Sequence, residues 1–392
     1  MMQIKKIKLI FIVLITLFLT GCWDLVDIQD INYVVAVGLD YDPEREVYIS
    51  YAQMLDFSFV AKQEQPPGQD PVVYIGRGEG KSVNMSLTNL YKTAQMKTLW
   101  SHVTTVVFTE RLLESGIEEV IDGYTRFSET RLSQWAFATN EPIDQLFATP
   151  AFFNLSTLLT LLHKPHEILE QRTFALSTRL KDVVIELTEP AKTVQLPSLT
   201  INSTQWKKNE ELTEKMEYDG IYFVKDNDYK GFLPLRDYQG LHWVSEETER
   251  YPIFLEVNGE EIGVLTIEGI KVKKKMELVA GQPVYHLDIK LEAQLLELLK
   301  EMEDHEVQKI AEKIVKKQVR DTFLTGVEKE IDLYGLEFET YVHHYREWEP
   351  LKENFPLQAQ LLGDISVEID VVHSGLLKFN QSAEHTTRHK RE

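Results

Sequence analysis

The only cysteine of this 392-residue chain, Cys22, stands in a context that predicts covalent lipidation. It closes the run Leu19-Thr20-Gly21-Cys22, which follows an apolar stretch from Leu9 to Leu19 and a basic start with Lys5, Lys6 and Lys8. Such a start, followed by a short apolar segment and small residues, is typical of a signal peptide. We therefore expect cleavage before Cys22 and a thioether-linked diacylglycerol on its sulfur. Because two acyl chains anchor a protein stably, this lipid would hold the mature chain on the outer face of a membrane. The alternative is an uncleaved signal anchor with a chance cysteine, although a membrane span needs ~20 apolar residues.

A glycine-rich segment at Gly76-Arg77-Gly78-Glu79-Gly80-Lys81-Ser82 could in principle bind phosphate. A phosphate loop needs a glycine five positions before the second one, and Ile75 occupies that position. The dinucleotide-binding spacing fails as well, because Gly80 follows Gly78 after two residues and not three. The segment therefore predicts a strand-to-helix turn with Ser82 near the helix N-cap.

Two pairs of histidines raise the question of a metal site. His163 and His166 flank a proline and have no nearby set of further ligands, while the adjacent His343 and His344 point apart on any regular element. We expect surface or helix-capping roles for these histidines, and no metal ligand is predicted.

Catalytic chemistry has no support in the sequence. No Gly-x-Ser-x-Gly motif is present, the one thiol is expected to be acylated, and 62 Asp and Glu residues make any chosen carboxylate pair uninformative. The formal charge of -20 opposes binding to nucleic acid and to anionic lipid. A catalytic carboxylate pair therefore stays open without support from the sequence, no cofactor and no nucleic-acid partner are predicted, and Cys22 is the one residue to which we assign a function.

Strands and helices alternate in the first part of the chain. A β-hairpin is expected over Tyr33 to Asp42 and Val47 to Leu55, with a loop over the Pro- and Gln-rich stretch 63–71. The apolar spacing then predicts, in order, a strand at 72–76, a helix at 82–96, a buried strand at 98–108 and a helix at 110–127. The polar stretch from Thr188 to Glu217 is the best candidate for a domain boundary.

The second part begins with a hairpin signal at Gly220 to Leu233 and a short helix near Leu235 to Val244. Two alternating strands, 264–272 and 285–293, precede the longest helical pattern of the chain, Val307 to Ile331, which should pack on them. A short helix near 338–348 and a strongly alternating strand at Ile365 to Val371 follow.

These patterns predict an α+β fold with three dissimilar domains, each with a mainly antiparallel or mixed sheet and packed helices. The expected boundaries are a signal peptide at 1–21, an N-terminal domain at 22–195 and a small middle domain at 196–265. A C-terminal domain at 266–378, with its long helix on a sheet, and a disordered tail at 379–392 would complete the chain.

Several segments, in a shared order over nearly the whole mature chain, resemble the Ger(x)C family of spore germination lipoproteins. They are Gly21-Cys22-Trp23-Asp24, Ile31 to Asp42, Gly78 to Ser82, Trp100 to Phe108, Arg111 to Ile117, Gly220 to Leu233, Gly240 to Trp243, Tyr334 to Leu336, Trp348, Phe355-Pro356 and Ile365 to Gly375. The chain departs from the family pattern at Val26-Asp27-Ile28 and at Asp237-Tyr238-Gln239-Gly240.

The resemblance implies a non-enzymatic C subunit of a nutrient germinant receptor, anchored through Cys22 on the extracytoplasmic face of the spore inner membrane. Its implied partners are a multi-span B-type subunit and an A-type subunit with soluble and membrane parts. One alternative is a solute-binding lipoprotein that delivers a small molecule to an importer, which two similar lobes would favour. Another is an extracytoplasmic hydrolase, which a cleft with convergent carboxylates would favour.

Overall fold

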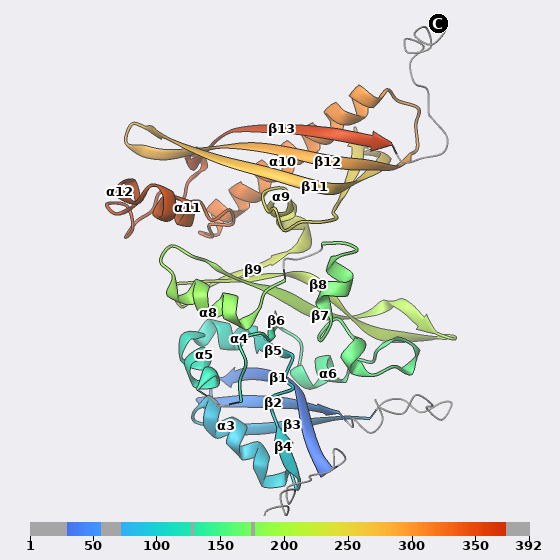
Figure 1. Ribbon diagram of the computed structural model, residues 1–392, viewed down its shortest axis with the longest axis vertical. Coiled ribbons are helices and arrows are strands. Elements are labelled where there is room, and N and C mark those ends of the chain that lie inside the picture. Colours follow the sequence, from blue (N-terminus) through green and yellow to red (C-terminus); the bar gives the residue numbers. More distant parts are fainter. Residues whose placement is uncertain (1–29, 56–71, 127–128, 174–176, 374–392) are drawn as a thin grey trace, which may run out of the picture.

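The computed structural model describes residues 30–55, 72–126, 129–173 and 177–373 (Figure 1). Their strands form two mixed sheets, which lie one above the other along the long axis of the molecule. We call residues 30–234 the N-terminal half and residues 235–373 the C-terminal half. Each half combines a sheet with helices, so the predicted α+β class is confirmed.

The N-terminal half contains a nine-stranded sheet with the order β3-β2-β1-β5-β6-β7-β8-β9 and β4 paired to β1. Its strands are β1 (Ile31–Asp42), β2 (Val47–Leu55), β3 (Val73–Gly80), β4 (Lys97–Leu99), β5 (Thr105–Thr109), β6 (Trp135–Thr139), β7 (Val194–Lys208), β8 (Glu211–Lys225) and β9 (Asp228–Pro234). The centre of the sheet, β1-β5-β6-β7, is parallel, and both flanks are antiparallel. The predicted hairpin is confirmed as β1 and β2.

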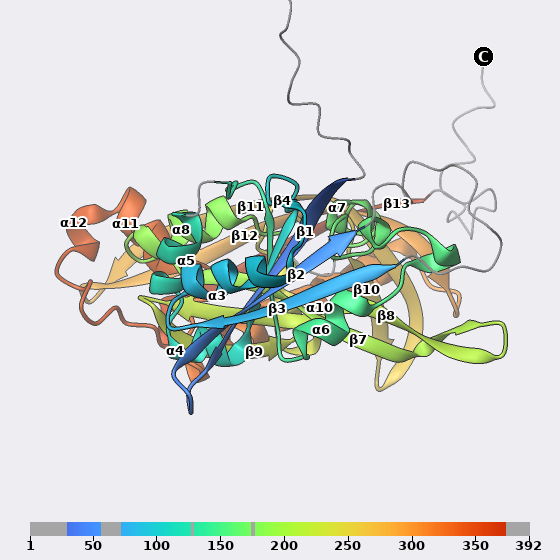
Figure 2. The same ribbon diagram turned by 90° about the horizontal axis from the view of Figure 1, so that it is seen from below.

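Helices cover both faces of this sheet (Figures 1 and 2). They are α3 (Val83–Leu90), α4 (Glu110–Ser115), α5 (Glu118–Thr125), α6 (Ile143–Ala148), α7 (Pro165–Leu169) and α8 (Leu180–Thr188), with short 3-10 helices η2 (Tyr91–Thr93), η3 (Phe152–Asn154) and η4 (Thr157–Leu159). Along β5, Val106 and Phe108 pack with α3, α4, α5 and α8, whereas Val107 packs with α6 and α7. This alternation gives the sheet an apolar core on each face.

Two predicted elements are each divided in the structure. The expected strand at 98–108 forms β4 and β5, and the expected helix at 110–127 forms α4 and α5. The break between the helices falls at Gly116, whose φ of +100° a helix cannot accommodate. The Asn227 side chain, from the turn between β8 and β9, accepts hydrogen bonds from the backbone N of Ile117 at 2.9 Å and of Glu118 at 2.8 Å. A cap from a distant turn cannot be detected in the local sequence.

The polar stretch from Thr188 to Glu217 is not a separator between sheets. Most of it belongs to β7 and β8, which form a long hairpin that continues the first sheet. Leu196 and Leu199 are buried, whereas positions 204–212 lie at or near the exposed end of the hairpin. Two strands exposed on both faces need no apolar residues, which is why the sequence lacks a strand pattern there.

The C-terminal half contains a four-stranded sheet with the order β10-β11-β12-β13. Its elements are β10 (Pro252–Val257), β11 (Glu260–Val279), β12 (Gln282–Leu298), β13 (Leu362–His373), α9 (Gln239–His242), α10 (Asp304–Glu328), α11 (Leu336–His343), α12 (Tyr345–Trp348), η5 (Leu235–Asp237) and η6 (Ala359–Leu361). The predicted long helix is α10, and its buried residues Val307, Ala311, Val315, Val319 and Phe323 pack on the sheet as expected.

Strand β8 contributes to the cores of both halves. Tyr222 and Val224 belong to the first core, while Ile221 and Phe223 belong to the second. Three domains with a sheet each are therefore not confirmed, because β7 to β9 complete the first sheet and β11 crosses position 265. The boundaries 22–195, 196–265 and 266–378 stay predictions, and segments 1–21 and 379–392 lie outside the described residues.

Candidate functional site

A polar cavity of about 410 Å³ lies at the carboxyl edge of the parallel strands. Asp40 near the end of β1, Thr109 at the end of β5 and Thr139 at the end of β6 line this edge cavity. The carboxyl edge, where the strand order reverses, is the usual ligand position in open α/β sheets. This edge is therefore the candidate position for a binding or catalytic site.

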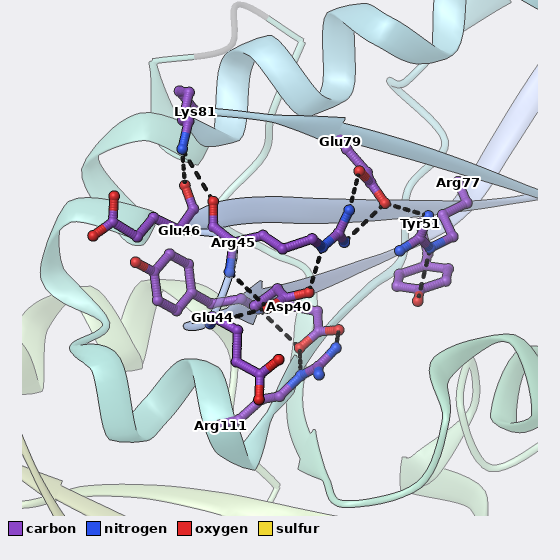
Figure 3. Close-up of polar contacts among 11 residues, drawn as sticks. Asp40, Glu44, Arg45, Glu46, Tyr51, Arg77, Glu79, Lys81 and Arg111 are labelled. Atoms are coloured by element: carbon purple, nitrogen blue, oxygen red, sulfur yellow. Dashed lines mark hydrogen bonds and ion pairs between the residues drawn. The ribbon is translucent and has the colours of Figure 1, made fainter.

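The carboxylate of Asp40 is buried at 2% exposure and fully engaged (Figure 3). Its Oδ1 accepts hydrogen bonds from Thr109 Oγ1 at 2.6 Å, from Arg111 Nε at 2.6 Å and from the backbone N of Tyr41 at 2.8 Å. A second guanidinium nitrogen of Arg111 bonds Oδ2. This arrangement fixes β1 to the start of α4, and it leaves Asp40 poorly placed to act on a substrate.

Two glutamates of the edge cavity also have internal partners. Glu110 accepts a hydrogen bond from the hydroxyl of Tyr229 at 2.6 Å, and Glu141 accepts one from Thr200 at 2.7 Å. These contacts connect the cavity wall to β9 and β7. The geometry therefore indicates a structural polar network at the edge of the sheet.

An exposed row of charges extends this network over the β1–β2 turn (Figure 3). Arg45 contacts Asp42 at 2.7 Å and Glu79 at 2.8 Å, and Arg77 contacts Glu79 at 2.5 Å. The hydrogen bond from Arg45 lowers the pKa of Glu79. Lys81 Nζ donates to the backbone oxygens of residues 45 and 46 at 3.1 and 3.0 Å, so its ammonium is used within the fold.

The glycine-rich segment forms the predicted strand-to-helix turn. Ser82 is the N-cap of α3, and its Oγ accepts a hydrogen bond from the backbone N of Met85. A Cβ at Gly78 would lie 2.2 Å from the backbone oxygen of Ser86, and a Cβ at Gly80 would lie 2.5 Å from the backbone nitrogen of Ser86. The glycines therefore allow α3 to cross β3 in direct contact.

The expectation of a surface or capping role was wrong for His163. Its ring is buried, with Nδ1 2.6 Å from Thr104 Oγ1 and Nε2 2.9 Å from Gln53 Oε1, and burial lowers its pKa to about 3. The histidine is thus a neutral part of the core. The burial of His163 could not be predicted from the sequence, because its hydrogen-bond partners Thr104 and Gln53 are 59 and 110 residues away.

The other three histidines are placed near the surface. His166 lies 3.1 Å from Glu170, His343 lies 3.6 Å from Glu339, and His344 stands between α11 and α12. Within the part of the chain that the structure describes, no group of three or more His, Cys, Asp or Glu side chains could hold a metal ion.

A larger cavity, of about 730 Å³, lies where β1 begins. Apolar and aromatic side chains of β1, β2, β3 and η2 line this entry cavity, including Ile31, Tyr74 and Tyr91. Its rim combines exposed apolar side chains, with Tyr74 64% exposed and Met96 45% exposed, with polar ones such as Arg77 and Lys92. Such exposed apolar groups favour an interaction surface.

Cys22 lies outside the described residues. It precedes Ile31 by nine positions, which an extended chain spans in at most about 30 Å. The entry cavity is therefore on the part of the molecule nearest in sequence to the predicted anchor. Among the described residues, no helix combines the length and apolar composition needed to cross a bilayer.

Two family models match the chain in sequence. "Spore germination protein N-terminal domain" matches residues 24–201, and "Spore germination B3/ GerAC like, C-terminal" matches residues 219–375. Both matched segments are thus those of a spore germination protein. The chain belongs to the Ger(x)C family, as the sequence resemblance predicted.

Individual relatives agree with this assignment. Spore germination protein KC of Bacillus subtilis (strain 168) is 21% identical over 95% of this chain and 96% of its own length. Spore germination protein B3 of the same strain is 23% identical over 75% of each chain, and protein A3 is 24% identical over 36% of this chain and 38% of its own. The crystal structure of the GerBC protein has the same fold, with a TM-score of 0.54 and 16% identity over 89% of this chain and 100% of that chain.

Proposed function

We propose that this protein is the C subunit of a nutrient germinant receptor, required for germination and anchored by a diacylglycerol on Cys22. The observation that carries the proposal is the presence of both family domains, in order, over residues 24–201 and 219–375. The match to spore germination protein KC extends over almost the full length of both chains. A shared function is best supported when no major part of either protein is missing from the match.

The proposed anchor is consistent with the position of the first family domain, which begins two residues after Cys22. Anchoring at this point would hold the protein on the extracytoplasmic face of the spore inner membrane. Confinement to a thin layer raises the effective concentration of membrane-bound partners, so weak contacts suffice for assembly. The partners that we propose are the A-type and B-type membrane subunits.

The apolar rim of the entry cavity, which lies where β1 begins, supports a docking role. Tyr74, Tyr91 and Met96 are each more than 40% exposed, and all three line that cavity. We propose that this rim faces the membrane-embedded partners.

A non-enzymatic role agrees with the hydrogen bonds of three of the four carboxylates that line the edge cavity, whereas the fourth, Glu114, is exposed. Asp40, Glu110 and Glu141 each have a hydrogen-bond partner within the fold, so they do not form a pair of free convergent carboxylates. The solute-binding alternative predicted two similar lobes, whereas the two sheets have nine and four strands in different orders. Neither alternative gains support from the geometry.

Replacement of the anchor residue tests the proposal. Cys22→Ala is expected to shift the protein out of the spore membrane fraction and to lower the rate of nutrient-triggered germination. Asp27→Asn, which leaves Leu19-Thr20-Gly21-Cys22 intact, is the matched control. It should retain both the membrane localisation and the germination rate of wild type. Normal germination with soluble, unacylated Cys22→Ala protein would overturn the anchoring part of the proposal.

A further inference from the structure

A third cavity, of about 230 Å³, lies between the two halves. The N-terminal half contributes Glu186 of α8, Lys192, Thr193 and Gln195, and the C-terminal half contributes Lys274 of β11, Asp332 and Glu339. We call this space the junction cavity. At ~30 Å³ per water molecule, it has room for a molecule about as large as seven waters.

Three buried polar atoms on the wall of the junction cavity have no hydrogen-bond partner among the described residues: Asp332 Oδ1, Thr193 Oγ1 and Gln195 Oε1. Asp332 is only 3% exposed, and its other oxygen accepts a hydrogen bond from the backbone N of Glu337 at 2.7 Å. Buried polar groups are almost always hydrogen-bonded. A molecule bound in the junction cavity would supply hydrogen bonds to all three atoms.

Both signs of charge border the same space. Lys274 Nζ donates to the backbone oxygen of Tyr334 at 2.7 Å, which uses one of the three donors of an ammonium. Burial lowers the pKa of Lys274, while Glu339 and Asp332 act against that shift. Lys192 adds a second ammonium, 4.1 Å from the centre of the Phe338 ring.

These charges select the class of ligand. The two ammonium groups would repel a metal cation, and Asp332 and Glu339 would repel an inorganic anion. A molecule that is neutral overall but has separate positive and negative groups can place each group beside side chains of opposite charge, so neither repulsion applies. We propose that the junction cavity binds a small zwitterion, whose carboxylate faces the lysines and whose ammonium group faces Asp332 and Gln195.

Calorimetric titration of the full-length protein, purified in mild detergent, tests this inference. The probes are glycine and 4-aminobutyrate, which differ in the separation of their charges, with acetate, methylamine, butyrate and butylamine as matched compounds that carry a single charge. We expect one site per chain with a Kd below about 1 mM for at least one zwitterion, and at least tenfold weaker binding of its single-charge analogues. No binding of either zwitterion, or equal binding of an analogue, would overturn the inference and leave a water-filled cavity.

Variants on β11 locate the site. Lys274→Met should weaken zwitterion binding at least tenfold, whereas Lys273→Met, an exposed neighbour on the same strand, should leave it unchanged. Asp332→Asn serves as a second variant, so that a folding defect of Lys274→Met does not decide the result. Equal binding by wild type and both cavity variants would place the ligand elsewhere. The titration involves no receptor partner, so its outcome is independent of the proposed receptor function.

Discussion

Asp40 and Arg111 form the best-defined charged contact of the N-terminal half. Removal of Arg111 would leave a carboxylate with 2% exposure without its cation. Arg111→Leu is therefore expected to lower the free energy of unfolding by about 2 kcal/mol, less than for a fully buried pair because the arginine side chain is 48% exposed. Chemical denaturation measures this change.

The control for that experiment is Arg126→Leu, which removes an exposed contact to Asp122 within one helix. Screening by water makes such contacts weak, so no measurable change is expected. Equal effects of the two substitutions would contradict the structural role assigned to Asp40.

Glu186 should make the stability depend on pH. Burial raises its pKa from 4.5 to about 7, so between these values the unfolded chain has released a proton that the folded protein retains. The contribution of Glu186 to stability is full below pH 4.5 and is lost as the pH rises towards 7. Glu186→Gln should remove this loss. Across that pH range, the free energy of unfolding of the variant should rise relative to that of wild type by at most about 3 kcal/mol. A difference between the two proteins that does not vary with pH would contradict this assignment.

For individual residues, the sequence revealed only local relationships. The N-cap at Ser82 was predictable because its partner, Met85, is three positions away. The environments of His163 and Asp40 could not be predicted, because their partners lie on other elements: Gln53 of β2 is 110 residues from His163, and Arg111 of α4 is 71 residues from Asp40.

Among the elements, the crossing of α3 over β3 depends most directly on a single position. Gly78→Ala would place a methyl group 2.2 Å from the backbone oxygen of Ser86, which cannot rotate away. We expect the free energy of unfolding, measured by thermal or chemical denaturation, to fall by about 2 kcal/mol. Gly123→Ala on α5, whose nearest neighbour would be at 3.6 Å, should instead stabilise the protein by about 0.5 kcal/mol. A neutral Gly78→Ala variant would show that the two elements are not in direct contact.

Elements with one buried face were predictable, and those without one were not. The β1–β2 hairpin and α10 have periodic apolar residues, because one face of each packs on a core. The outer part of the β7–β8 hairpin is exposed, so its sequence is polar and resembled a linker. Its pairing depends on the backbone register, which side-chain pattern does not encode on an exposed ribbon.

Strand β8 packs into the cores of both halves, so we expect the two halves to unfold together. Its alternate residues belong to different cores, and Lys225 at its end forms an ion pair with Glu337 of α11. Phe223→Ala should therefore lower the free energy of unfolding by about 3 to 5 kcal/mol. It should also lower amide-exchange protection in both α10 and α3. Loss of protection in the C-terminal half alone would mean that the halves unfold independently.

We propose that this protein works as a lipid-anchored subunit beside membrane-embedded partners. The most direct test is affinity isolation from spore membranes solubilised in mild detergent, through a tag at the C-terminus, followed by mass spectrometry of the captured proteins. We expect recovery of A-type and B-type germinant receptor subunits with the wild-type protein and their loss with Cys22→Ala. Recovery of importer subunits in their place, or isolation of the wild-type protein without any membrane partner, would contradict it.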